Sequence, residues 1–241
     1  MSKCICNKAV ASFKTLSHVC IGNLWVFEDL LPEEKAALAS SAIRKGYKKG
    51  DLIFIQGEAA DKMFLLKAGC IKISKISKDG NEAILDIRKT GDFLGEQIFW
   101  EDFKYPGTAI CMQDSYICGF DKAGFEKMIL ENPRIGLVVI KNLSKHIEFL
   151  NSRASCSILG DLKNKLYELL LNLGGEYNNS SNNFIEIDFP ISHEELGFLI
   201  GAHRVSITKA MNLLKKTGLI RKEGRNLFVC KTNTVSNHLE H

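Results

Sequence analysis

The stretch ISHEELGFLIGAHRVSITKAMNLLKKTG, residues 191–218, decides the fold of the C-terminal part of this chain. Ser192 can cap the orphan amides of a helix while Glu195, three residues on, reaches back to complete a capping box. Gly201 supplies the backbone freedom that a tight turn between two helices needs, and Gly218 is placed to end the second helix. The stretch therefore predicts a helix-turn-helix.

The second helix, expected from about His203 to Lys216, has two distinct faces. Ile207, Met211 and Leu214 recur at helical spacing and form its inner face. The N-terminal part of its outer face is the part that such helices present to base edges in the major groove. Residues 219–229 then follow as strand, turn and strand, which predicts a wing. The residues that we expect to contact DNA are Ser192, His203, Arg204, Val205, Ser206, Thr208 and Lys209.

Charge supports this interpretation. Residues 196–231 hold eight Lys or Arg against one acid, about +7, whereas the whole chain is +4. The basic charge is therefore concentrated in the segment that is expected to neutralise DNA phosphates.

Length and composition indicate two domains. A chain of 241 residues with 45% hydrophobic content can bury two cores. Because it has neither an apolar run of about 20 residues nor an N-terminal signal peptide, we expect a cytoplasmic protein without a membrane partner. Residues 239–241 are interpreted as the beginning of an expression tag.

The N-terminal half is expected to form an antiparallel β-roll. Between residues 45 and 120, short β-rich runs are separated by glycines, and Asp79-Gly80 offers a hairpin turn. From Pro133 to about Ile158 the pattern becomes helical. Apolar residues alternate there in steps of three and four, which predicts a seam for dimerisation. They are Ile140, Leu143, Ile147, Leu150 and Ala154.

Several motifs in this order resemble the Crp/Fnr family of bacterial transcription regulators. They are residues 49–58, 69–73, 91–96 and 200–209. The resemblance implies an α+β fold: residues 1–130 as an effector-sensing, cyclic-nucleotide-binding-like β-roll with an N-terminal helical and cysteine-bearing segment, 131–158 as a dimerisation helix, and 159–238 as a winged helix-turn-helix. It also implies double-stranded DNA, a second copy of the chain, RNA polymerase and a small-molecule or redox effector as partners.

The resemblance also bears on the effector. Cyclic-AMP-binding members hold the phosphate with an arginine from an Arg-Ser-Ala stretch, and this chain has residues 106–109, Pro-Gly-Thr-Ala, in that region. We therefore do not expect cyclic AMP. Residues 203–209 are similar to the helix of chlorophenol-responsive regulators of organohalide respiration, which favours an organic effector. The expected effector-binding residues are Gly95, Glu96, Thr108, Ala109, Asn142 and His146.

The cysteines leave a second interpretation open. Oxygen-sensing members that resemble the fumarate-nitrate reduction regulator hold a [4Fe–4S] cluster with three N-terminal cysteines and one in the roll. Cys4, Cys6, Cys20 and Cys118 stand in about those regions, although Cys4 and Cys6 are separated by a single residue. The alternatives are a thiol–disulfide switch at the three N-terminal cysteines and a haem with His18 or Cys20 as axial ligand.

The sequence therefore predicts a homodimeric, effector- or redox-gated transcription regulator. Val205 stands where the family has a glutamate that accepts from cytosine, and valine can only contact a thymine methyl, so we expect an A·T-rich inverted repeat. The alternatives are a [4Fe–4S] oxygen sensor and a constitutive DNA-binding protein with an inactive sensor. We do not expect an enzyme, because no catalytic triad, carboxylate pair or phosphate loop stands in the sequence.

Overall fold

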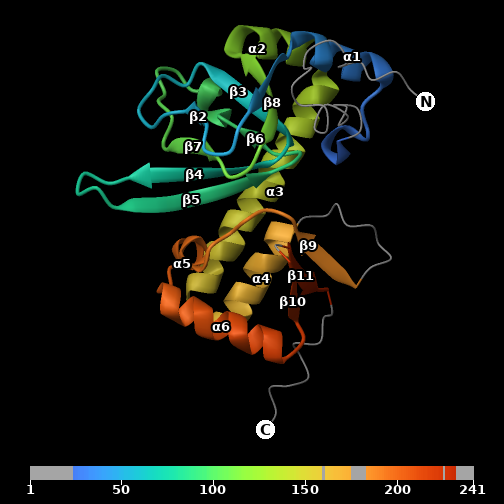
Figure 1. The fold of residues 1–241 in the computed structure, drawn as a ribbon. Helices are drawn as coiled ribbons and strands as arrows, with labels where there is room; N and C mark the ends of the chain where they lie inside the picture. The colour runs from blue at the N-terminus through green and yellow to red at the C-terminus, as the bar shows by residue number, and fades with distance from the viewer. Residues whose placement is uncertain (1–23, 159–160, 175–182, 225, 232–241) are drawn as a thin grey trace. The chain divides into compact units, whose positions relative to one another are not determined.

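The structure is a computed structural model that describes residues 24–158, 161–174, 183–224 and 226–231; for Trp25 and residues 152–158 it describes the backbone alone. The chain divides into two compact units, residues 1–148 and 149–241, which we call the N-terminal and the C-terminal unit. Figure 1 shows the strands of the N-terminal unit and the helices and small sheet of the C-terminal unit.

The N-terminal unit consists mainly of short antiparallel strands. They are β1 (Ile43–Tyr47), β2 (Leu52–Phe54), β3 (Lys62–Ala68), β4 (Cys70–Ile76), β5 (Glu82–Lys89), β6 (Phe93–Leu94), β7 (Thr108–Cys111) and β8 (Ser115–Asp121). They pair as two four-stranded sheets, in the orders β1-β8-β3-β6 and β2-β7-β4-β5. The β4–β5 hairpin turns where Asp79-Gly80 predicts it, and Gly80 has a φ of +81°. The predicted β-roll is confirmed.

Helices cover the outer face of the first sheet. They are η2 (Trp25–Phe27), α1 (Pro32–Ser41), η3 (Glu96–Phe99), α2 (Lys122–Glu131) and α3 (Pro133–Ile158). The first turn of α2 is capped by Asp121, whose side chain accepts from the Gly124 amide. The long helix expected from Pro133 to about Ile158 is present as α3, and α2 ends at Glu131, just before it begins.

Strand β3 serves two cores. Met63 and Leu65 point toward the helices and lie in one apolar cluster with Phe27, Phe93 and Phe125. Phe64 and Leu66 point the other way and lie in a second cluster between the two sheets, together with Phe54, Tyr105 and Ile117. Successive side chains of a strand point to opposite faces, so one short apolar strand can line both cores.

Lys67 interrupts this pattern. The pairing of β3 with β8 shifts between Leu66 and Ala68, so Lys67 sits in a bulge. Its side chain is fully buried, and its ammonium lies 4.7 Å from the ring centroid of Tyr116. Within the described residues, Lys67 Nζ has no hydrogen-bond partner.

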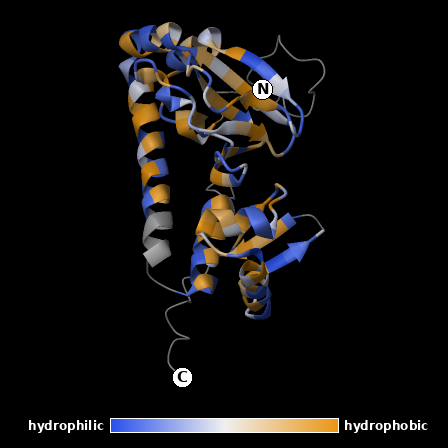
Figure 2. Ribbon diagram, turned by 90° about the vertical axis from the view of Figure 1, so that its left-hand side faces the viewer, coloured by the Kyte–Doolittle hydropathy of each residue, from blue (hydrophilic) through white to orange (hydrophobic). Residues whose placement is uncertain are grey.

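Apolar residues recur along α3, as Figure 2 shows. Of the predicted seam, Ile140, Ile147 and Leu150 are exposed, whereas Leu143 is partly buried and packs against the core of the N-terminal unit. The side chain of Ala154 lies outside the described residues. Leu137, which the sequence analysis did not include, is also exposed.

In its described residues, the C-terminal unit combines the end of α3 and three further helices with a three-stranded sheet. The further helices and the strands are α4 (Leu162–Gly174), β9 (Phe184–Ile187), α5 (His193–Ile200), α6 (Arg204–Lys216), β10 (Ile220–Glu223) and β11 (Asn226–Cys230). The sheet has the order β10-β11-β9, so the predicted wing is joined by β9, a strand that the sequence analysis did not anticipate. The winged helix-turn-helix is confirmed.

Candidate nucleic-acid interface and sensor site

The capping box that opens α5 is present. The Glu195 amide donates to Ser192 Oγ (3.1 Å), and the Ser192 amide donates to Glu195 Oε2 (2.8 Å). The Ser192 hydroxyl also donates to the same carboxylate (2.9 Å). Ser192, predicted to contact DNA, is exposed and already serves as the N-cap.

The turn between α5 and α6 needs two glycines. Gly201 is the C-cap of α5 with a φ of +74°, as predicted. Gly197, four residues earlier, lies so close to the turn that a Cβ there would be 2.5 Å from the Ala202 carbonyl oxygen. A larger residue at this position would have to displace the turn, and a glycine inside an otherwise apolar helix was the available signal for it.

Helix α6 presents the expected two faces. Ile207, Met211 and Leu214 are buried. Arg204, Val205 and Lys209 are exposed, as is His203, which occupies the N-cap position; Ser206 and Thr208 are half-buried. The structure therefore brings the predicted DNA-contacting residues together along the first turns of α6, next to the N-terminus of α5.

The sequence analysis did not include His193, which lies beside the predicted DNA-contacting residues. His193, the first residue of α5, places its Nδ1 2.9 Å from Oγ1 of Thr208. Thr208 Oγ1 in turn donates to the Arg204 carbonyl oxygen at 3.0 Å. Two helices that are adjacent in sequence are thus tied by side chains fifteen residues apart.

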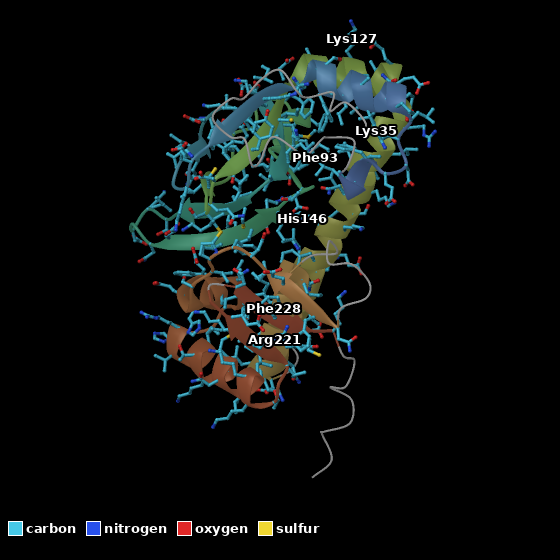
Figure 3. The ribbon with its side chains drawn as sticks, turned by 45° about the vertical axis from the view of Figure 1, so that its right-hand side comes forward. Lys35, Phe93, Lys127, His146, Arg221 and Phe228 are labelled. Atoms are coloured by element: carbon cyan, nitrogen blue, oxygen red, sulfur yellow. The ribbon has the colours of Figure 1, made fainter. Side chains whose placement is uncertain are left out.

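The wing carries a stacked arginine. The guanidinium of Arg221 lies 4.4 Å from the ring centroid of Phe184 and 5.1 Å from that of Phe228. Its Nε is 3.2 Å from Glu223 Oε1. Figure 3 labels Arg221 and Phe228 on this sheet. Arg221 therefore joins β9, β10 and β11 by contacts of a type that stabilises strands across a sheet.

A buried ionic cluster lies in the N-terminal unit, where effector residues were expected. Asp86 and Arg88 share one face of β5 because they are two residues apart. Arg88 Nε lies 2.6 Å from Asp86 Oδ2, and Arg88 Nη2 lies 2.8 Å from Glu96 Oε1. Arg88 Nη1 donates to the Phe93 carbonyl oxygen (2.9 Å). We call Asp86, Arg88, Glu96 and His146 the sensor network.

Helix α3 takes part in this network through two side chains. His146 Nε2 lies 3.3 Å from Asp86 Oδ2. Asn142, which is buried, donates from Nδ2 to the Gly91 carbonyl oxygen (3.3 Å) and accepts from the Phe93 amide (3.5 Å). Figure 3 shows His146 and Phe93 in the N-terminal unit. The predicted anchors Asn142 and His146 therefore contact the roll directly.

Burial and neighbouring charge set the titration of this region. Burial and the Arg88 guanidinium lower the pKa of His146, although Asp86, Glu96 and Asp92 oppose the shift. Burial also raises the pKa of Asp92, against the pull of Arg88. Burial lowers the pKa of Arg88, but Asp86, Glu96 and Asp92 outweigh it, so the net shift is upward. The guanidinium therefore stays charged, whereas His146 is held neutral around pH 7.

Two predicted effector residues lie elsewhere. Thr108 Oγ1 accepts from the Gln56 amide (3.1 Å), and Ala109 is fully buried between the sheets. Gly95 has a φ of +79°, and a Cβ there would be 2.6 Å from the Lys62 carbonyl oxygen. The network instead includes Asp86 and Arg88, which the sequence analysis missed. Two opposite charges alternating within an apolar strand were the signal for them.

The predicted metal ligands are described only in part. Cys118 is fully buried in the apolar cluster that lies under the helices. Cys4, Cys6 and Cys20 lie outside the described residues, as does His18. Within residues 24–158, 161–174, 183–224 and 226–231, no group of three or more His, Cys, Asp or Glu side chains is arranged to hold a metal ion. In the same part of the chain, every helix is too short or too polar to cross a membrane.

Known proteins resemble both units. Residues 44–132 match the cyclic nucleotide-binding domain, and residues 164–234 match the Crp-like helix-turn-helix domain. The chain is 22% identical over 211 residues to the CRP-like cAMP-activated global transcriptional regulator of Mycobacterium tuberculosis, covering 88% of this chain and 94% of that protein. It is 26% identical over 184 residues to the anaerobic regulatory protein of Bacillus subtilis, covering 76% and 77%.

Solved structures share the fold. The structure of FixK2 from Bradyrhizobium japonicum matches with a TM-score of 0.65 at 16% identity and covers 79% of this chain and 93% of that one. At this identity the likeness concerns the fold alone.

Proposed function

We propose that this chain, which belongs to the Crp/Fnr family of DNA-binding transcription regulators, works as a dimer in which the sensor network controls the affinity of α6 for DNA. One observation carries the proposal: α3 holds His146 against Asp86 and also exposes an apolar edge to solvent. A helix that contacts both the sensor and a second subunit can relay a change from one to the other. Its relatives are transcription regulators and not enzymes.

The dimer would form along α3. Leu137, Ile140, Ile147 and Leu150 are 64%, 59%, 57% and 40% exposed, and their spacings of three, seven and three place them on one side of the helix. Apolar side chains at this spacing are typical of a seam between two helices. A two-fold axis along this seam would relate two copies of α6, as an inverted repeat requires.

Base contacts are assigned to the exposed residues at the start of α6. Arg204 can fork onto O6 and N7 of guanine, and Val205 can only contact a thymine methyl. Lys209 adds a further cation without bidentate geometry. We assign a direct phosphate contact to Ser206. Thr208 would act on a phosphate indirectly, because its hydroxyl hydrogen is donated to the Arg204 carbonyl oxygen. We place Ser192 and His203 in the same interface. An A·T-rich inverted repeat remains the expected site, with RNA polymerase as the further partner at a promoter.

The effector is expected to act on the sensor network. Three carboxylates, Asp86, Asp92 and Glu96, surround the one guanidinium of Arg88, so the network changes its charge balance when a ligand or proton alters one member. Because Thr108 and Ala109 are engaged within the roll, a cyclic phosphate is not the ligand that we expect there. An organic effector near Gly95, Glu96, Asn142 and His146 fits the likeness of α6 to the chlorophenol-responsive regulators.

A redox input is the second candidate. Cys118 lies on β8, where it is the antiparallel partner of Leu65 on β3, and it belongs to the apolar cluster under the helices. With Cys4, Cys6 and Cys20 it would supply four thiolates to a [4Fe–4S] cluster, which would contribute oxygen-labile redox chemistry. A thiol switch would use the same N-terminal cysteines.

The experiment that tests the proposal measures DNA binding and its control together. A labelled duplex is first selected from a randomised library by protein purified without oxygen. Its affinity is then compared before and after exposure to air, before and after addition of chlorophenols, and in the variant Asp86→Asn. Iron and acid-labile sulfide are assayed on the same protein.

The outcomes separate the alternatives. Tighter binding with a chlorophenol that is lost in Asp86→Asn supports the organic effector. Weaker binding in air, with about four irons per chain, supports the cluster. The same loss in air without iron supports the thiol switch. An affinity that none of these treatments changes would mean a constitutive DNA-binding protein and would refute the proposed control.

A further inference from the structure

The contact between His193 and Thr208 assigns the proton on the imidazole. Thr208 has a single hydroxyl hydrogen, and it is donated to the Arg204 carbonyl oxygen. The hydroxyl can therefore only accept at its contact with His193 Nδ1, 2.9 Å away. Nδ1 must carry a hydrogen, so a neutral His193 has its lone pair on Nε2.

The second nitrogen of the ring is open. Among the described residues, no group forms a hydrogen bond with Nε2 of His193, and this atom is not buried. It is therefore accessible to solvent. A proton added to Nε2 would give the ring a second donor without disturbing the bond to Thr208.

The charges that face His193 are mainly positive. Arg204 and Lys215 face it from α6, and Lys222 faces it from β10. On its own helix the neighbouring acids are Glu194 and Glu195, and Glu195 is held by the Ser192 cap. Burial first, and then these three cations, lower the pKa of His193 below its usual value. DNA phosphates would neutralise the same cations and so remove part of the cause of this shift.

We propose that His193 is a phosphate-binding residue of the DNA interface, and that its imidazole takes up a proton when DNA binds. In the complex, Nδ1 donates to Thr208 and Nε2 donates to a phosphodiester oxygen. The proton comes from solvent, and no bond other than this N–H is formed. The inference rests on the DNA-binding role of α6, and it adds a pH dependence to that role.

The sign of the dependence follows from linkage. A group that binds a proton only in the complex makes affinity fall as pH rises. The fall begins near the lowered pKa of free His193, which lies below about 6.5, and ends above its pKa in the complex. Within this window the affinity should fall by up to about tenfold for each pH unit and each bound subunit.

The test measures proton uptake by the full chain on the selected duplex. Calorimetric titrations near neutral pH in two buffers of different ionisation enthalpy give the number of protons bound, and fluorescence anisotropy gives the affinity from about pH 6 to about pH 8.5. His193→Asn is the main variant, because its amide nitrogen can still donate to Thr208 while the side chain cannot titrate. His238→Asn, which replaces an imidazole that is not assigned to the DNA interface, is the matched control.

We expect about one proton per bound subunit for the wild type and for His238→Asn, and close to none for His193→Asn. His193→Asn should also bind more weakly at low pH and show a nearly flat pH profile. The inference is overturned if the wild type takes up no proton, or if His193→Asn takes up as many protons as the wild type. A wild type that binds no duplex at any pH would contradict the DNA-binding role itself. Equal melting temperatures of the variants would confirm that folding is unchanged.

Discussion

His146 on α3 lies 3.3 Å from Asp86 on β5, measured from Nε2 to Oδ2, so this contact joins the long helix to the roll beside the two hydrogen bonds of Asn142. The side chains of His146 and Asp86 are largely buried, at 17% and 7% exposure. Water competes little for polar contacts in such a buried site, because the local dielectric is low.

Stability should depend on the protonation of His146. Its folded-state pKa is lowered, so its contribution is present above the unfolded value of about 6.5 and is lost as pH falls toward the folded value. We expect the melting temperature to fall on acidification in this range, and His146→Gln to reduce that fall. Thermal unfolding of the wild type and of His146→Gln at about pH 5.5 and about pH 7.5 measures the change in melting temperature. Parallel pH profiles for both proteins would contradict the prediction.

Removing the Arg88 side chain should be strongly destabilising. Arg88→Met leaves Asp86 and Glu96 buried without their cation, and breaking a buried pair in this way costs about 3–5 kcal/mol. The triple variant that adds Asp86→Asn and Glu96→Gln should recover most of the loss. Lys48→Met, which removes the exposed pair with Asp114, should cost only about 0–1 kcal/mol. Urea unfolding of the four proteins checks the order.

Replacing Lys67 should stabilise the N-terminal unit. Its ammonium is buried and lacks a hydrogen-bond partner within the described residues, a condition that costs a neutral polar group about 1–3 kcal/mol and a charged group more. Lys67→Met keeps the length and the packing, so its free energy of unfolding should rise. Lys67→Gln retains a buried polar group and should bring no gain. A loss of stability in Lys67→Met would show that the contact with the Tyr116 ring outweighs the desolvation.

A charge on the exposed edge of α3 should prevent dimerisation. Ile147→Asp places a carboxylate in the middle of the proposed seam, where it would be desolvated on association. Sedimentation equilibrium should show a monomer at concentrations at which the wild type is a dimer. Glu148→Lys changes the charge of the adjacent exposed residue and should leave the mass unchanged. Monomeric Ile147→Asp should also bind an inverted repeat no better than a single half-site.

Arg204→Ala should cost roughly 1–3 kcal/mol of DNA-binding free energy at one base position. Its guanidinium is exposed at the start of α6, where it can fork onto a guanine. Binding to a panel of duplexes that differ at single positions measures the loss of discrimination. Lys216→Ala, in the last turn of α6, serves as the comparison and should leave base preference unchanged. Equal weakening of Arg204→Ala on selected and random duplexes would refute base reading.

Local signals made the helix-turn-helix predictable, because a capping box and a glycine C-cap act over a few residues. The sensor network was not predictable, because Arg88 meets Glu96 and His146 only after strands and a long helix have been brought together. Strand β1 was missed for a related reason. Arg44 and Lys45 interrupt the apolar pattern that would indicate a strand there. Strand β1 forms because it pairs with β8, which lies about seventy residues later in the chain.

Position along a helix did not reveal which apolar residues of α3 face the roll. Leu143 shares the period of Ile140 and Ile147, yet it packs against the N-terminal core. Periodicity gives the faces of a helix, and the partner of each face depends on tertiary packing.

The double-sided packing of β3 has a mechanical consequence. Changing one side chain of this strand alters one core only, because Met63 and Leu65 point away from Phe64 and Leu66. A displacement of its backbone must instead move side chains in both cores at once, and close-packed interiors resist such movement. We therefore expect β3 to transmit a displacement as a rigid element. A shift that begins between the two sheets would reach the apolar cluster under the helices without a hinge.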